Sequence, residues 1–245
     1  MYDLGKFSLA EMMDCGGKLR GLGAGTSSME EAANKVVRSL YDELQDGASG
    51  KRASALVRLY KTHAFGELDA SLQTFATGLM PNAEIKDETR CLTLLATAGD
   101  LPEWNDRRAS NGHKAIPLPS EQILQSIPMV AQLVKSLRVD PSIIVKPDPK
   151  LLLDLAEQTF NVFFVRDAKG SPYVPAQDTF VIPREIRSVL GFGFVLPPKD
   201  LVAVILFTRM LLPQATAELF KTLALSVKLA LLPHAAGKVF EDSRA

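Results

Sequence analysis

The alternation of apolar and polar positions is most informative in the last third of the chain. Two apolar runs, 188–196 and 201–207, flank Pro197-Pro198-Lys199-Asp200, whose composition is typical of a tight turn. The runs predict two strands that pair as an antiparallel hairpin. Because both runs are apolar on both faces, we expect the hairpin at or near the centre of a covered sheet.

A long helix is predicted after the hairpin, from Pro213 to about Leu232, where Pro233 ends it. Its apolar residues extend around most of the circumference and leave a narrow polar seam. A helix buried on one face only does not have this pattern. We therefore expect a sheet on one side of it and another helix, from the same chain or from a second copy, on the other.

Helical and strand periodicities also occur earlier in the chain. Ser8 and Ser28 each precede a helical apolar pattern and have a glutamate three residues later, which indicates a capped helix start. Alternation over 54–62 predicts a half-buried strand. The other predicted elements are helices at 9–19, 29–44, 68–80, 120–137 with a break near Pro128, and 151–156 after the Asp148-Pro149 cap, and strands at 91–98 and 159–165.

A glycine-rich segment, Gly21-Leu22-Gly23-Ala24-Gly25, follows the first helix. A phosphate-binding loop needs a strand before its glycines and the full fingerprint spacing. Here a helix precedes them, so we interpret the segment as a helix-ending break and not as a nucleotide site.

Composition narrows the classes of function. The 245 residues are 47% hydrophobic and 23% charged, with a formal net charge of zero. This composition is typical of a globular protein and gives no electrostatic footprint for a nucleic acid. The longest apolar run is far shorter than the roughly 20 residues that a bilayer-spanning helix needs, so we expect a cytoplasmic protein without membrane contact.

The cysteines and histidines do not predict a metal centre. Cys15 and Cys91 are far apart in the sequence and have no metal or redox spacing, so we expect buried, inert thiols. The three histidines have no paired ligand spacing.

The order of these elements resembles that of a GAF-type sensor domain. The resemblance rests on Ser28-Met29-Glu30-Glu31-Ala32-Ala33 at the start of the second helix and Ile186-Arg187-Ser188-Val189-Leu190 before the hairpin, and it covers about residues 27–232. Segments 112–119, 170–178 and 223–232 are also similar to the amino-terminal sensory region that precedes histidine kinase and related output modules in bacterial signalling proteins.

The resemblance implies an α/β domain of the α+β type, with a GAF-like antiparallel sheet of about five or six strands. A helical layer would come from the N-terminal and C-terminal helices. Residues 1–26 would form an N-terminal helix with a glycine-rich linker, 27–232 the sensor domain with loop insertions, and 233–245 a C-terminal tail. The chain lacks the phenylalanine and the spacing of the cyclic-nucleotide signature, and Cys91 is poorly placed for a bilin, so neither ligand is expected.

Two irregular segments, 101–120 and 166–180, are rich in polar and aromatic side chains, and in the resembling fold such segments cover the ligand pocket. They contribute most of the candidate ligand-binding residues, in which aromatic planes would stack, arginines would neutralise an anion and amides would orient it. These residues are Trp104, Asn105, Arg107, Arg108, His113, Tyr173, Gln177, Asp178, Arg184 and Arg187. The alternative is a structural role for most of them, in surface ion pairs, turns and small clusters.

The functional prediction is a regulatory input domain that binds a small molecule and is not an enzyme. It would form a homodimer through its helices and act on a kinase or similar output module, in the same chain or in another. Two alternatives stay open: a ligand-free dimerisation or scaffold domain, and a hydrolase using Ser110 and His113. The identity of a cofactor is open, and haem bound through His113 is one possibility.

Overall fold

The computed structural model describes residues 1–136, 138, 140–146, 161–197 and 200–241. Its centre is an antiparallel sheet of six strands in the order β5-β4-β3-β8-β7-β6. The strands are β3 (Ser54–Ala64), β4 (Arg90–Gly99), β5 (Ala115–Leu118), β6 (Asn161–Val165), β7 (Ser188–Leu196) and β8 (Asp200–Thr208). The predicted fold class is confirmed. The helix predicted at 151–156 lies outside the described residues.

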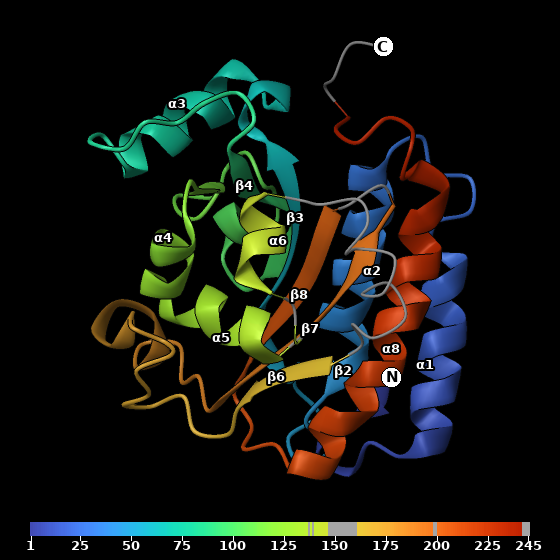
Figure 1. Ribbon diagram of the computed structural model, residues 1–245. Helices are drawn as coiled ribbons and strands as arrows, with labels where there is room; N and C mark the ends of the chain where they lie inside the picture. Colours follow the sequence, from blue (N-terminus) through green and yellow to red (C-terminus); the bar gives the residue numbers. More distant parts are fainter. Residues whose placement is uncertain (137, 139, 147–160, 198–199, 242–245) are drawn as a thin grey trace.

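Helices cover both faces of this sheet (Figure 1). One face carries the three long helices α1 (Leu9–Gly21), α2 (Met29–Glu43) and α8 (Gln214–Leu231). The opposite face carries the short helices α4 (Glu121–Ser126), α5 (Pro128–Ser136) and α6 (Pro141–Val145), and α3 (Ala70–Leu79) lies beside β5. We call these the long-helix face and the short-helix face. The predicted helical layer of N-terminal and C-terminal helices is confirmed, because α1 packs along α8.

Several shorter elements connect these layers. β1 (Tyr2–Asp3) pairs in parallel with β2 (Leu44–Gln45) beside the main sheet. The single-turn elements are η1 (Leu4–Lys6), η2 (Phe65–Glu67), η3 (Pro102–Trp104), η4 (Gln177–Val181, π-helical) and η5 (Leu232–His234).

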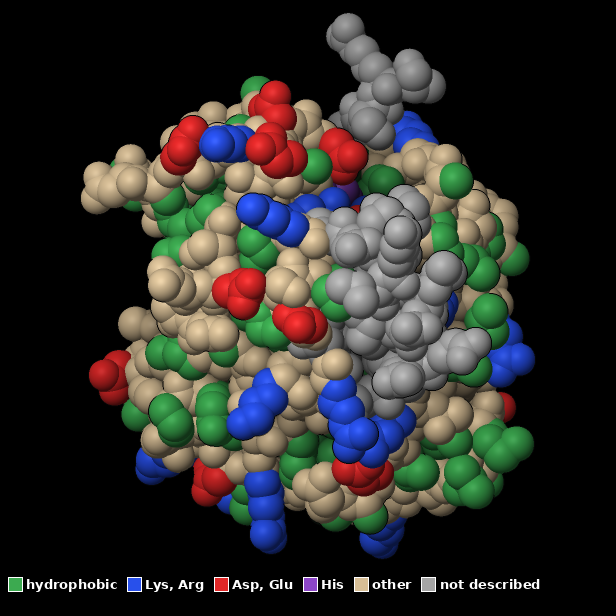
Figure 2. All heavy atoms as spheres, viewed as in Figure 1, with side chains coloured by type: hydrophobic (Ala, Val, Ile, Leu, Met, Phe, Trp, Pro, Cys, Tyr) green, Lys and Arg blue, Asp and Glu red, His purple; other side chains and the backbone are tan. Residues whose placement is uncertain are grey.

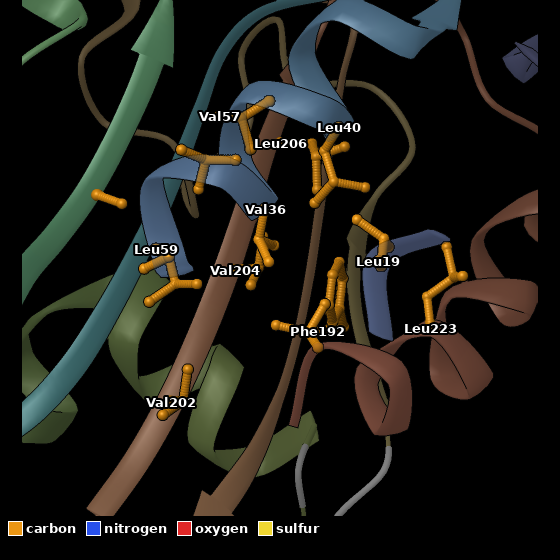
Figure 3. Packing of buried hydrophobic residues seen from close by; sticks show 14 of the residues in the cluster. Leu19, Val36, Leu40, Val57, Leu59, Phe192, Val202, Val204, Leu206 and Leu223 are labelled. Atoms are coloured by element: carbon orange, nitrogen blue, oxygen red, sulfur yellow. The ribbon is translucent and has the colours of Figure 1, made fainter. Parts of the chain in front are cut away.

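The hairpin β7–β8 has the central position that its apolar runs predict. Its register runs from Ser188 opposite Thr208 to Leu196 opposite Asp200, and β8 pairs with β3 on its other side. Figure 3 shows Val204 of β8 beside Val36 of α2, and Val202 and Leu206 of β8 belong to the same buried cluster. Each such buried aliphatic side chain contributes about 1.5–3 kcal/mol, so this face supplies much of the stability.

Local sequence signals begin and end the long helices as predicted. Ser8 forms a complete capping box with Glu11, and the Ser28 hydroxyl accepts from the Glu31 amide at the start of α2. The glycines after α1 end that helix, and Gly23 has a further role in packing. A Cβ on Gly23 would lie 1.9 Å from the Ala230 carbonyl oxygen, so only glycine permits this approach of the chain to α8.

Two local predictions are wrong. β3 was expected to be half-buried, but it is buried on both faces from Ser54 to His63, because α2 covers one face while the loop after β4 covers part of the other. The segment 101–120 was expected to be irregular, but 115–118 forms the edge strand β5.

Part of the closing helix remains exposed. Leu225, Leu229 and Leu232 keep 44%, 37% and 39% of their surface accessible, although α8 packs against both the sheet and α1. On the side of the molecule shown in Figure 2, acidic and basic side chains are interspersed and form no field of one sign. Within the described part, no helix combines the length and the apolar character needed to cross a membrane.

Candidate functional site

A buried arginine lies near the middle of the sheet on its short-helix face. Arg58 of β3 is opposite Ile205 of β8, and only 8% of its surface is exposed. Its Nη2 donates to Ser110 Oγ at 3.0 Å, and its Nη1 donates to Tyr60 Oη at 3.2 Å and to the Gly112 carbonyl at 3.4 Å. Its Nε has no hydrogen-bond partner among the described residues. Every described contact of this cation is therefore to a neutral oxygen atom.

Other buried cations of the described residues differ in this respect. Lys61 contacts Asp200 Oδ2 at 2.6 Å, and Arg107 contacts Glu30 Oε1 at 2.8 Å. Removing a charge from water costs several kcal/mol, and a carboxylate partner offsets much of that cost. Arg58 has no such carboxylate partner among the described residues, so the cost of burying its charge is not offset there in the same way.

The loop after β4 supplies the groups that surround Arg58. Ser110 is fully buried and also donates its hydroxyl to the Gly112 carbonyl at 3.1 Å. His113 lies at the surface with φ of 58°, a left-handed conformation that is uncommon for histidine. Desolvation lowers the pKa of His113, and the nearby Arg58 cation lowers it further.

An aromatic stack lies next to this group at the end of β4. Trp104 packs edge-to-face on Phe180, and Phe180 packs edge-to-face on Phe207. The Arg184 guanidinium lies over the Trp104 ring at 5.4 Å from its centroid. The Trp104 carbonyl accepts from Thr97, which is the cross-strand neighbour of Arg58. Trp104 and Arg184, two of the predicted site residues, therefore lie together. Through Phe180 this stack joins the two irregular segments.

Three other predicted residues of the first irregular segment have different contacts. Asn105 fixes the loop to the end of β4, because its amide donates to the carbonyls of Gly99 and Leu101. Arg107 and Arg108 contact Glu30 at the start of α2, at 2.8 and 3.0 Å. These arginines therefore serve the long-helix face, while Ser110 and His113 of the same loop lie near Arg58.

The second irregular segment is organised by Gln177. Its side chain donates to the carbonyls of Val174 and Ala168 and accepts from the Gly170 amide at 2.8 Å. The backbone of Arg187 pairs with Thr208, and its side chain lines an open depression of about 560 Å³. Asp178 and Tyr173 are exposed, the latter by 41%. The ligand-binding role of these residues remains a prediction. The ten predicted residues do not line one common pocket within the described structure but lie at several separate places.

Sequence reasoning did not select Arg58, Tyr60 or Ser110 as a set. The available signal was an arginine on one face of β3 between Leu56 and Tyr60, both large and buried in the structure. An arginine on an otherwise apolar strand face indicates a specific partner. That partner could not be identified, because Ser110 is far away in the sequence.

Thiol and metal chemistry are poorly supported by the described residues. Cys15 and Cys91 are both free and buried, as predicted, and burial raises the pKa of each thiol to about 12. A reactive cysteine needs the thiolate form near neutral pH. Within the described residues, no group of three histidine, cysteine, aspartate or glutamate side chains could hold a metal ion.

The fold has counterparts among solved structures, although no protein-family model and no curated protein matches the chain. Free methionine-R-sulfoxide reductase from Neisseria meningitidis, solved with its substrate, is similar at a TM-score of 0.50 and 10% identity, over 92% of this chain and 90% of that chain. A GAF domain of a phosphoenolpyruvate-protein phosphotransferase from Acinetobacter has a TM-score of 0.46 and 13% identity, over 96% of this chain and 100% of that one. Identities this low concern the fold alone, and at that level the predicted GAF-type architecture is confirmed.

Proposed function

We propose that this chain is a regulatory domain that binds a small molecule carrying an oxyanion, either a carboxylate or a phosphate, at Arg58. The ligand would lie on the short-helix face of the sheet. Arg58 would neutralise the anion through Nε and the neighbouring Nη2, which together match the two oxygen atoms of such a group. Tyr60, Ser110 and His113 would add neutral hydrogen bonds to the rest of the molecule.

The observation that carries this proposal is the lack of a carboxylate partner for Arg58 within the described structure. Its contacts to Tyr60 and Ser110 are neutral, and its Nε is unpaired. A purely structural role gives no reason for a charge at this position, because an apolar residue would fill the same space without the desolvation cost. Groups that are suboptimal for stability are common at binding sites.

The test compares Arg58→Met with Arg20→Met, which makes the same chemical change at an exposed position of α1. Native mass spectrometry detects any co-purified anion, and calorimetric titration with phosphate and with citrate measures affinity for added oxyanions. We expect binding to the wild type and to Arg20→Met, and at least a tenfold loss in Arg58→Met. Equal affinity in all three proteins would exclude Arg58 as the anion site.

Stability provides a second readout of the same variant. Arg58→Met removes two good hydrogen bonds but also the desolvation cost of a buried cation, and these effects are of similar size. We therefore expect the ligand-free variant to unfold within about 1 kcal/mol of the wild type. A loss of 3 kcal/mol or more would show that Arg58 is a structural residue.

The finer parts of this function are also proposals. The exposed Leu225 and Leu229 of α8 and Leu232 of η5 support a homodimer, since a monomer rarely leaves a contiguous apolar stripe uncovered. We propose that the domain acts in the cytoplasm on a kinase or similar output module, in line with the resemblance of its sequence to bacterial sensory regions. A ligand-free dimerisation domain is the alternative, and it is favoured if the Arg58 titration is negative.

An enzymatic function is the third candidate, because one structure of similar fold is a methionine-R-sulfoxide reductase with its substrate. The raised pKa values of Cys15 and Cys91 argue against thiolate chemistry in this chain. Ser110 donates to a backbone carbonyl and accepts from Arg58, so its hydroxyl is not poised as a nucleophile. We therefore propose binding without turnover.

A further inference from the structure

The C-terminal segment 238–241 is docked on the start of α2. The Met29 and Glu30 amides donate to the carbonyls of Lys238 and Val239 at 3.0 and 2.8 Å. The first amides of a helix have no partner within the helix. The segment therefore completes the cap of α2 that Ser28 begins.

The side chain of Phe240 fixes this segment in place. Its ring stacks on the His63 imidazole, with 5.0 Å between centroids, and the Arg107 guanidinium lies 4.7 Å from its centroid on the ring face. Glu30 contributes twice, because Oε1 contacts Arg107 and Oε2 accepts from the Glu241 amide at 2.9 Å. Docking thus depends on Arg107 being held beside α2.

The loop that holds Arg107 also forms the candidate site. Ser110, three residues after Arg107, accepts from Arg58 Nη2, and the Gly112 carbonyl accepts from Nη1. The loop is thus held on both faces of the sheet, by Arg107 on the long-helix face and by Ser110 on the short-helix face. His113 at its end has the left-handed backbone noted above, which is a strained conformation of the kind found in switch segments.

Granted the proposed function, we propose that the loop 105–113 couples anion binding at Arg58 to the docking of the segment 238–241. An oxyanion bound through Nε and Nη2 competes with Ser110 for Nη2 and weakens the loop's anchor on the short-helix face. Arg107 then holds Phe240 and Glu30 less firmly, and the C-terminal segment leaves α2. The output of the domain is the release of this segment.

The Met29 and Glu30 amides report directly on docking, since they are bonded to the segment. Their hydrogen exchange, measured by NMR on the full chain, should become at least fivefold faster on saturation with the oxyanion that binds best, phosphate or citrate, which is the lower end of typical allosteric coupling. The Val36 amide in the middle of α2 is the internal control and should keep its rate. Arg58→Met should abolish the response, whereas Arg20→Met should retain it.

Coupling must be reciprocal, and this gives a second measurement. Phe240→Ala undocks the segment without changing any contact of Arg58. It should therefore tighten the affinity for the same oxyanion, and the factor should equal the acceleration of exchange that this anion causes in the wild type. Unchanged affinity in Phe240→Ala would contradict the coupling.

The possible outcomes separate the two proposals. If the anion binds through Arg58 but the exchange at Met29 and Glu30 stays within twofold, the coupling is wrong and the proposed function stands. If neither phosphate nor citrate binds, the proposed function fails for both anions. The link between the loop 105–113 and the docked segment is then tested without ligand. Ser110→Ala and Arg58→Met should then each accelerate exchange at least fivefold, and unchanged rates would refute the coupling as well.

Discussion

Acidification should destabilise this protein through His63. The imidazole lies on the long-helix face, is 3% exposed and stacks on Phe240. In the part of the chain that the structure describes, neither ring nitrogen has a well-formed hydrogen bond. Desolvation lowers the pKa of His63 well below its ordinary value of 6.5, and the nearby cations Lys61, Arg90 and Arg107 lower it further. The folded protein therefore keeps this side chain neutral where the unfolded chain protonates it.

The magnitude follows from proton linkage. Below pH 6.5 the unfolded state binds one more proton than the folded state, so stability falls as pH falls until the folded imidazole itself titrates. Each pH unit inside this window costs up to about 1.4 kcal/mol per proton. Between pH 7 and pH 5 the loss from His63 alone integrates to at most about 2 kcal/mol, the limit for an imidazole that stays neutral in the folded state throughout this interval.

The assay is urea unfolding at pH 7 and pH 5, for the wild type and for His63→Phe, which keeps a planar ring against Phe240 but cannot titrate. The wild type should lose up to about 2 kcal/mol more than the variant over this interval. His113, whose pKa is also lowered, contributes equally to both proteins and cancels in the difference. Carboxylates titrate mostly below this range. A difference below about 0.5 kcal/mol would refute the assignment of a neutral buried His63.

Three further predictions concern packing, the buried ion pairs and assembly. Gly23→Ala should destabilise the protein by at least about 1–3 kcal/mol in chemical denaturation because its Cβ would clash with the Ala230 carbonyl, whereas Gly17→Ala, with open space around it, should be neutral or slightly stabilising. Glu30→Ala should cost about 3–5 kcal/mol in the same assay, because it removes the carboxylate that contacts the buried Arg107 and the acceptor of the Glu241 amide. Leu225→Glu combined with Leu229→Glu should convert a dimer to a folded monomer in sedimentation analysis, and a wild type that is monomeric at every concentration would contradict the proposed dimer.

The fold was predictable where local chemistry matches the final environment. The β7–β8 hairpin and α8 are apolar in the proportions that a buried sheet and its covering helix require, and prolines mark their limits. The burial of β3 was predicted wrongly because the strand carries Arg58, Lys61 and His63. Such side chains indicate exposure when only neighbours in sequence are considered. All three are buried, and the group that compensates Lys61, Asp200, lies on a strand distant in sequence.

The candidate site was predictable only in part. His113 and Trp104 were selected because irregular, polar and aromatic segments tend to carry function, and the structure places the loop that contains them beside Arg58. Arg107 and Arg108 have the same local signals but face α2, because the side to which a loop residue points is set by its tertiary contacts. β5 escaped prediction because it is a four-residue edge strand that contains Pro117.

The contrast between the buried cations ranks the binding function above the scaffold alternative. A domain that served only to dimerise would gain by replacing Arg58 with an apolar residue, because nothing within the described structure neutralises that charge. Lys61 and Arg107 show that this fold does provide carboxylates for buried cations elsewhere. An arginine with hydroxyl and carbonyl partners, beside the loop that also holds the segment 238–241, supports the proposed anion site. Oxyanion binding that is lost in Arg58→Met and kept in Arg20→Met is therefore the observation that would separate a sensor from a scaffold.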